Sequence, residues 1–117
     1  MAKYETALTG SFDELLTLLD SGILKGSMSA SLEDSSDVQS GSTRCAVRVY
    51  ERYSMMGENR VSMNITLLGN GSNLYVVAIT AGGSKAVLFK INTFGEESFL
   101  THAENIIEDY KRTQQRK

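Results

Sequence analysis

The pattern of apolar and polar positions between residues 44 and 91 predicts four consecutive β-strands, because strand side chains alternate with a period of two. Residues 61–68 alternate apolar side chains with serine, asparagine and threonine, whereas 74–80 is apolar on both sides. Residues 44–54 and 85–91 complete the set. The predicted core face carries Cys45, Val47, Val49, Glu51, Tyr53, Val61, Met63, Ile65, Leu67, Leu74, Val76, Ala78, Val87, Phe89 and Ile91.

Three turns fix the register of these strands. Asn70-Gly71 is a strong signal for a two-residue hairpin turn, which needs positive φ, and Gly82-Gly83 predicts a second turn of the same length. An odd loop through 57–59 keeps the apolar side of 44–54 on the core, whereas a two-residue loop would turn its arginines inward. The resulting pairs are Leu67 with Leu74, Ala78 with Val87, and Tyr53 with Met63.

The segments before residue 44 predict a strand, a helix and a second strand. Residues 2–9 alternate as a strand does, and Ser11 with Glu14 forms a capping box that starts a helix over 12–21. The helix carries an apolar stripe, and Gly22 is expected to end it. Residues 27–34 are expected to pair with 44–54 so that Glu33 lies opposite Arg44. The serine-rich and aspartate-rich stretch 34–43 predicts a mobile loop.

A second capping box, from Thr93 to Glu96, predicts a helix that runs to about Tyr110, and the basic tail 111–117 is expected to fray. The sequence therefore predicts an α+β fold. Its antiparallel sheet has five to six strands in meander order, and two helices pack on one face. Residues 1–110 form a single domain, which is consistent with a chain of 117 residues.

Composition narrows the function classes. The net charge of −2 disfavours nucleic-acid binding by the whole domain, although four of the seven residues in 111–117 are basic. No stretch is apolar enough to span a membrane, and the N-terminus lacks the apolar run of a signal peptide, so we expect a cytoplasmic protein. The single cysteine, Cys45, is interpreted as an inert buried thiol.

The candidates for chemistry are few, and the sequence predicts no catalytic residue, metal site or cofactor. His102 is the one histidine, and no nucleophile or ligand cluster accompanies it. The run 82–85, Gly-Gly-Ser-Lys, lacks the spacing of a phosphate-binding loop. Glu51 is unusual, because its predicted place on the core face requires a partner or a raised pKa. Its ordinary interpretation is a paired carboxylate at the sheet margin, and the alternative is a functional acid.

The second face of the predicted sheet is the better functional clue. Two helices cover only one face, and a large open apolar patch usually marks a partner surface. We therefore expect homodimerisation through this face. The structural alternative is that a segment of the chain assigned elsewhere by this prediction packs against the face. The expected interface residues are Tyr75, Val77, Ile79 and Leu88. Alternatively, the face binds a small anionic ligand or forms an enzyme site, through Arg44, Arg48, Arg52, Asn64 and Glu51.

Three runs of the chain, at 44–54, 79–85 and 90–100, resemble an uncharacterised family of small bacterial proteins found mostly in Firmicutes, a domain of unknown function. The resemblance covers nearly the whole chain. It implies a bacterial cytosolic protein and brings no activity, cofactor or catalytic residue. The function expected from the sequence is thus a non-enzymatic binding or assembly module.

Overall fold

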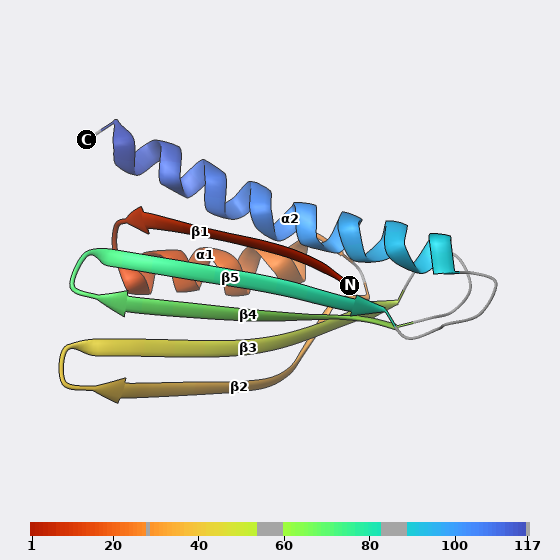
Figure 1. Ribbon diagram of the computed structural model, residues 1–117, viewed down its shortest axis with the longest axis horizontal. Helices are drawn as coiled ribbons and strands as arrows, with labels where there is room; N and C mark the ends of the chain where they lie inside the picture. Colours follow the sequence, from red (N-terminus) through yellow and green to blue (C-terminus); the bar gives the residue numbers. More distant parts are fainter. Residues whose placement is uncertain (28, 54–59, 83–88, 117) are drawn as a thin grey trace.

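The computed structural model describes residues 1–27, 29–53, 60–82 and 89–116, and within 89–97 it describes the backbone alone. The elements are β1 (Ala2–Thr9), α1 (Phe12–Lys25), β2 (Ser31–Ser40), β3 (Thr43–Tyr53), β4 (Arg60–Asn70), β5 (Asn73–Gly82) and α2 (Phe89–Gln115). The strands form one antiparallel sheet in the order β1-β5-β4-β3-β2 (Figure 1). The predicted α+β fold, with a meander and two helices, is confirmed.

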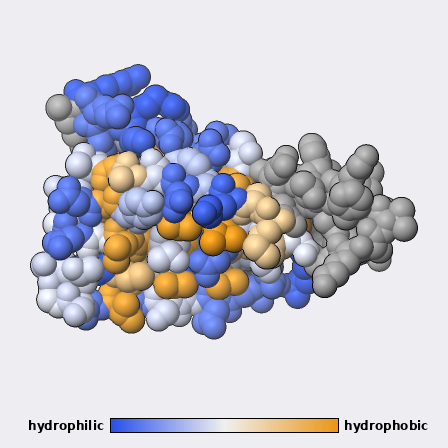
Figure 2. Space-filling view, viewed as in Figure 1, coloured by the Kyte–Doolittle hydropathy of each residue, from blue (hydrophilic) through white to orange (hydrophobic). Residues whose placement is uncertain are grey.

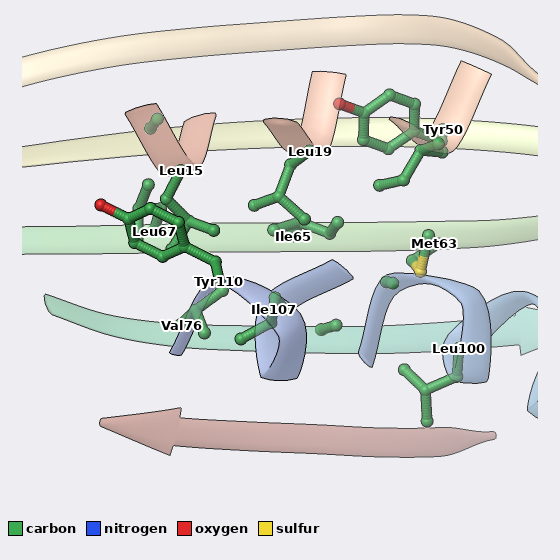
Figure 3. Close-up of a cluster of buried hydrophobic side chains, with 14 of the residues drawn as sticks. Leu15, Leu19, Tyr50, Met63, Ile65, Leu67, Val76, Leu100, Ile107 and Tyr110 are labelled. Carbon is green, nitrogen blue, oxygen red and sulfur yellow. The ribbon is translucent and has the colours of Figure 1, made fainter. Parts of the chain in front are cut away.

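The hydrophobic core lies between one face of the sheet and the two helices. We call this side the inner face and the opposite side the outer face. Leu15 and Leu19 of α1 and Ile107 of α2 point toward β4 and β5 and are almost completely buried (Figure 3). The hydroxyl of Tyr110 accepts a hydrogen bond from the backbone amide of Ser11 (2.8 Å) and donates one to Glu14 (2.9 Å). The C-terminal half of α2 is thereby tied to the start of α1.

Helix α1 begins as predicted and ends later. The Ser11 hydroxyl caps it by accepting a hydrogen bond from the amide of Glu14. Gly22 does not end the helix, which continues to Lys25. A Cβ at Gly22 would lie 2.7 Å from Cδ1 of Ile106 on α2. The glycine therefore serves the close approach of the two helices, and the predicted stop at this position is wrong.

The hairpin of β4 and β5 forms where Asn70-Gly71 predicts it, with a different register. Gly71 has φ +60°, but the turn closes between Asn70 and Asn73, so that Leu67 lies opposite Val76 rather than Leu74. The shift is two residues, and an even shift leaves every side chain on its expected face. The predicted inner-face residues of β4 and β5 are accordingly all buried: Val61, Met63, Ile65, Leu67, Leu74, Val76 and Ala78.

Strand β3 turns toward the core the face opposite to the one predicted, while its direction is unchanged. Tyr53 pairs with Arg60 instead of Met63, a shift of three residues, and an odd shift exchanges the two faces. The inner face therefore receives Arg44, Ala46, Arg48, Tyr50 and Arg52. The outer face receives the residues predicted for the core, namely Cys45, Val47, Val49, Glu51 and Tyr53. The prediction placed the more apolar side of β3 on the core. It was wrong because Asp20 and Asp37, which are distant in the sequence, compensate the charge of Arg48 on the inner face.

Strand β2 occupies Ser31–Ser40, so the mobile loop predicted over 34–43 is wrong. Leu32 lies opposite Tyr50, and a bulge follows at Glu33. Pairing of the backbone with β3 overrides the low strand propensity of this serine-rich sequence. The predicted cross-strand pair of Glu33 with Arg44 does not form, because the register puts Arg44 opposite Gln39. Arg44 forms an ion pair with Asp13 of α1 at 3.0 Å.

The strand predicted over 85–91 is wrong where the structure describes it, because residues 89–91 begin α2. Residues 83–88, including the predicted interface residue Leu88, lie outside the described part of the chain. The strand predicted over 2–9 forms as β1; it pairs with β5, and Tyr4 lies opposite Ala78. A short apolar run fits a buried strand and a buried helical segment equally well, and here tertiary packing decided between them.

Helix α2 is longer than predicted. Thr93 and Glu96 lie inside it, and it continues through Lys111 to Gln115. An apolar stripe of α2 faces the core, with Phe99, Ala103 and Tyr110 buried. Across the described residues, no helix combines the length and apolar character that a membrane span requires.

Candidate functional site

The uncovered outer face carries a continuous line of apolar residues. Ala7, Tyr75, Leu68, Cys45 and Val38 lie opposite one another in adjacent strands, so the line crosses all five strands. We call it the apolar row. Leu68 is 44% exposed and Val38 60% exposed, although both are large aliphatic residues. Figure 2 shows the row as an orange band near the turn end of the sheet.

Two further rows lie beside the apolar row, farther from the hairpin turns. From β1 to β2, the second row is Glu5, Val77, Thr66, Val47 and Ser36. The third row, in the same order, is Lys3, Ile79, Asn64, Val49 and Asp34. In both rows the positions on β5 and β3 are apolar, β4 is polar, and the edges are polar or charged. The order of polar and apolar positions in these two rows is therefore the same from β1 to β2 as from β2 to β1.

Polar residues border the three rows at both ends. Toward the hairpin turns, Thr9, Asn73, Asn70, Thr43 and Ser40 form a row that is polar on every strand. Toward the other end, Glu51 forms an ion pair with Arg60 at 2.8 Å and accepts a hydrogen bond from Ser62 at 3.2 Å. An apolar centre with a polar border is the usual anatomy of a protein–protein interface.

The structure separates the residues of the predicted anion site. Arg44, Arg48 and Arg52 lie on the inner face, whereas Glu51 and Asn64 lie on the outer face. The predicted interface residues fare differently. Tyr75, Val77 and Ile79 lie on the outer face together, and Tyr75 and Ile79 are exposed.

Arg48 is the centre of a polar cluster that the sequence did not reveal. Its side chain is 9% exposed and contacts Asp20 of α1 (Nε to Oδ1, 3.3 Å) and Asp37 of β2 (Nη1 to Oδ1, 3.0 Å). Tyr50 donates a hydrogen bond to the same Asp20 oxygen. Two carboxylates thus compensate the charge of one buried guanidinium. In the sequence, the partners of Arg48 appear only as acidic residues scattered through 20–37, and nothing there indicates the cluster.

The pKa shifts in this cluster come from burial and from contacts within the cluster, which is typical of groups that stabilise a fold. Burial raises the pKa of the Tyr50 hydroxyl far above its usual value, and the hydrogen bond to Asp20 raises it further. For Arg48, burial lowers the pKa, but the hydrogen bond to Asp37 and the charge of Asp20 outweigh burial and raise it. Burial lowers the pKa of Arg52, and its guanidinium lies 4.6 Å from the Phe99 ring centroid.

The remaining reactive side chains have structural settings. His102 Nε2 lies 2.8 Å from the carbonyl oxygen of Gly22 and so links α2 to the end of α1. Cys45 is half-buried on the outer face, which corrects its predicted burial in the core. Among the residues that the structure describes, no group of three histidine, cysteine or acidic side chains is arranged to hold a metal ion.

A pocket of about 390 Å³ lies between β1, the start of β5 and the last turns of α2. Its lining includes Leu8, Leu74 and the charged residue Lys111, whose amino group donates a hydrogen bond to Thr6 at 2.9 Å. The lining is mainly aliphatic and amide in character and contains no acid, histidine or cysteine. The outer face, rather than this pocket, is therefore the candidate functional site.

The described residues define an α+β protein whose sheet is covered by helices on one face and open on the other. The model of a family of unknown function (DUF6054) matches residues 1–111. Because this match spans nearly the whole chain, the protein belongs to that family, and the predicted resemblance to an uncharacterised family is confirmed. No curated protein and no solved structure matches the chain.

Proposed function

We propose that this protein is a non-enzymatic assembly module that forms a homodimer through the outer face of its sheet. The observation that carries the proposal is the apolar row, which crosses all five strands and leaves Leu68, Tyr75 and Val38 exposed. Exposed apolar surface that is contiguous and bordered by polar residues is typical of protein interaction sites.

The composition of β3 supports the proposal independently. Its outward residues Cys45, Val47 and Val49 are apolar, while its inward residues include the charged Arg44, Arg48 and Arg52. A strand in a stable monomer normally turns its more apolar side toward the core. Strand β3 does the reverse, and a partner on the outer face would account for this orientation.

The ionisable groups with raised pKa values support a binding role over a catalytic one. Burial and a carboxylate partner raise the pKa of Tyr4, which donates to Glu108, and likewise the pKa of Tyr50, which donates to Asp20. Each of these pairs joins a strand to a helix, so each stabilises the fold. The resemblance to small bacterial proteins, together with a lone cysteine thiol, is consistent with a bacterial cytoplasmic location.

The proposal is tested by light scattering over a concentration series on the wild type and on two matched variants. Leu68→Lys places a charge in the apolar row, and Leu18→Lys places one on the solvent side of α1, where the leucine is also 44% exposed. We expect the wild type to reach twice the 12.8 kDa chain mass, and Leu68→Lys to remain monomeric. Leu18→Lys should behave as the wild type does.

Val77→Glu provides a second disruption on β5, and circular dichroism of each variant verifies that it folds. A wild type that remains at 12.8 kDa at every concentration would contradict the proposal. A folded Leu68→Lys variant that dimerises as tightly as the wild type would assign association to another surface, such as the exposed edge strand β2.

A further inference from the structure

The polarity of the outer face is symmetric about β4, and in the third row the charges at its two edges are opposite. In this row, Lys3 lies on β1 at one edge and Asp34 lies on β2 at the other, and both are exposed. Lys3 also lies 3.7 Å from Glu5 on the same strand. Between Lys3 and Asp34, Ile79 and Val49 flank the polar Asn64. A surface with this pattern is complementary to a copy of itself whose edges are exchanged.

We propose that the partner is a second copy of this chain, related by a two-fold axis that runs parallel to β4 midway between the two facing sheets. The inference rests on the proposed function and adds its geometry. This rotation exchanges the edges of the sheet and leaves each row over the same row of the partner copy. Strand β4 lies over the partner's β4, β3 over the partner's β5, and β2 over the partner's β1.

The facing residues then match in kind along every row. In the second row, Val47 faces the partner's Val77, and in the third row Val49 faces the partner's Ile79. Leu68 faces its own copy on the axis. Lys3 faces the partner's Asp34, and symmetry repeats this pair at the opposite edge. Opposite charges at the border of an apolar contact favour one arrangement over its competitors.

The other two-fold arrangement, with the axis in the same plane but perpendicular to the strands, matches poorly. It reverses the order of the rows, so the apolar row lies over the partner's third row. Leu68 would then face the partner's Asn64, and Val38 would face the partner's Asp34. That arrangement buries a carboxylate against a valine without a counterion, which is unfavourable.

The size of the surface is sufficient for a reversible dimer. Five strands spaced about 4.8 Å apart, with three rows that span roughly 20 Å along the strands, give roughly 500 Å² of sheet on each copy. The total of about 1,000 Å² lies at the lower limit for a specific interface. We therefore expect a dimer whose population depends on concentration.

Charge reversal tests the arrangement. In Lys3→Glu a carboxylate faces the partner's Asp34 at both edges of the dimer, and in Asp34→Lys two ammonium groups meet. We expect each single variant to raise the dimer dissociation constant about tenfold at low salt, and the double variant to restore it to within about threefold of the wild type. Lys25→Glu, an exposed lysine at the end of α1, is the control and should leave the constant unchanged.

Cross-linking gives a second readout, which tests the face-to-face contact centred on β4 and leaves the direction of the axis to the charge reversal. In a Cys45→Ser background, Thr66→Cys places a thiol near the axis, whereas Ser40→Cys places one on β2, roughly 19 Å from its own copy across the sheet. A short bismaleimide should link dimers of the Thr66→Cys variant and not those of the Ser40→Cys variant.

The outcomes separate the two proposals. If the wild type dimerises and Leu68→Lys does not, but the double charge reversal fails to restore affinity, the axis is wrong and the proposed function survives. Efficient cross-linking of the Ser40→Cys variant without that of the Thr66→Cys variant would also overturn this axis. A wild type that is monomeric at every concentration overturns both proposals.

Discussion

Leu67 and Leu68 are consecutive residues of β4, yet the first is fully buried and the second keeps 44% of its surface exposed. Two helices cover the inner face around Leu67, and the ring of Phe12 packs against Gly69, the glycine of β4 on that face. The outer face around Leu68 is apolar along the apolar row and mixed elsewhere, and no described helix lies over it. The two faces therefore differ both in their share of apolar residues and in what covers them.

The two faces also treat charge differently. On the inner face, Arg48 is enclosed by Asp20 and Asp37, which come from α1 and β2. On the outer face, the pair of Glu51 and Arg60 lies in cross-strand neighbours at the border, where Arg60 is 53% exposed. The inner arrangement stabilises the orientation of β3, whereas the outer pair lies at the border and leaves the three rows of the outer face available for contacts.

The largest expected effect on stability comes from truncating Leu67 rather than Leu68. Leu67→Ala removes a fully buried side chain and leaves a cavity, so we expect the free energy of unfolding to fall by about 2–5 kcal/mol. Leu68→Ala should change it by less than about 1 kcal/mol when measured on the monomer at low protein concentration. Urea denaturation of both variants provides the measurement. Equal losses would mean that the outer face is covered within the monomer.

A smaller effect tests how tightly the inner face is packed. A Cβ at Gly69 would lie 2.7 Å from Cδ2 of Phe12 and 3.1 Å from Cδ2 of Leu74. We therefore expect Gly69→Ala to destabilise the protein by about 1–3 kcal/mol, because the buried ring has to move.

The matched control for Gly69→Ala is the double variant with Phe12→Leu, which creates space for the new methyl group. Urea denaturation of both single variants and the double variant completes a double-mutant cycle. The double variant should lose less stability than the sum of the two single variants. Strict additivity would show that Phe12 does not restrict this position.

The smallest effect at neutral pH concerns the inner polar cluster. Tyr50→Phe removes the hydrogen bond to Asp20, while Arg48 still contacts that carboxylate, so we expect a loss of about 1 kcal/mol at pH 7. The pKa of Tyr50 is raised in the folded state. Above about pH 10 the unfolded chain therefore releases a proton that the folded chain retains, and stability falls as the pH rises.

Because Tyr50→Phe removes this titration, the slope of stability against pH above about pH 10 should become less steep, by up to about 1.4 kcal/mol per pH unit. Chemical denaturation between pH 7 and 11 measures that slope. Tyr53→Phe is the matched control, since Tyr53 lies on the same strand and is 54% exposed. An unchanged slope in Tyr50→Phe would contradict the role given to its buried hydroxyl.

The candidate site was partly accessible from the sequence. Tyr75, Val77 and Ile79 were predicted to share an exposed face, because β5 is apolar on both sides and two helices cover only one of them. The contribution of Cys45, Val47 and Val49 was missed, since these residues were assigned to the core. Val38 was missed as well, because its serine-rich surroundings indicated a loop rather than a strand.

The sequence by itself determined what depends on neighbours along the chain. The period-two pattern of β4 and β5, the Asn70-Gly71 hairpin, the Ser11 cap and the stripe of α2 each follow from local geometry and local burial. Tertiary structure alone decided that β1 joins the sheet beside β5 rather than beside β2, and which face of β3 points inward. Apolar residues occur on both sides of β3, so its orientation depends on Asp20 and Asp37, which become neighbours of Arg48 only when the chain folds.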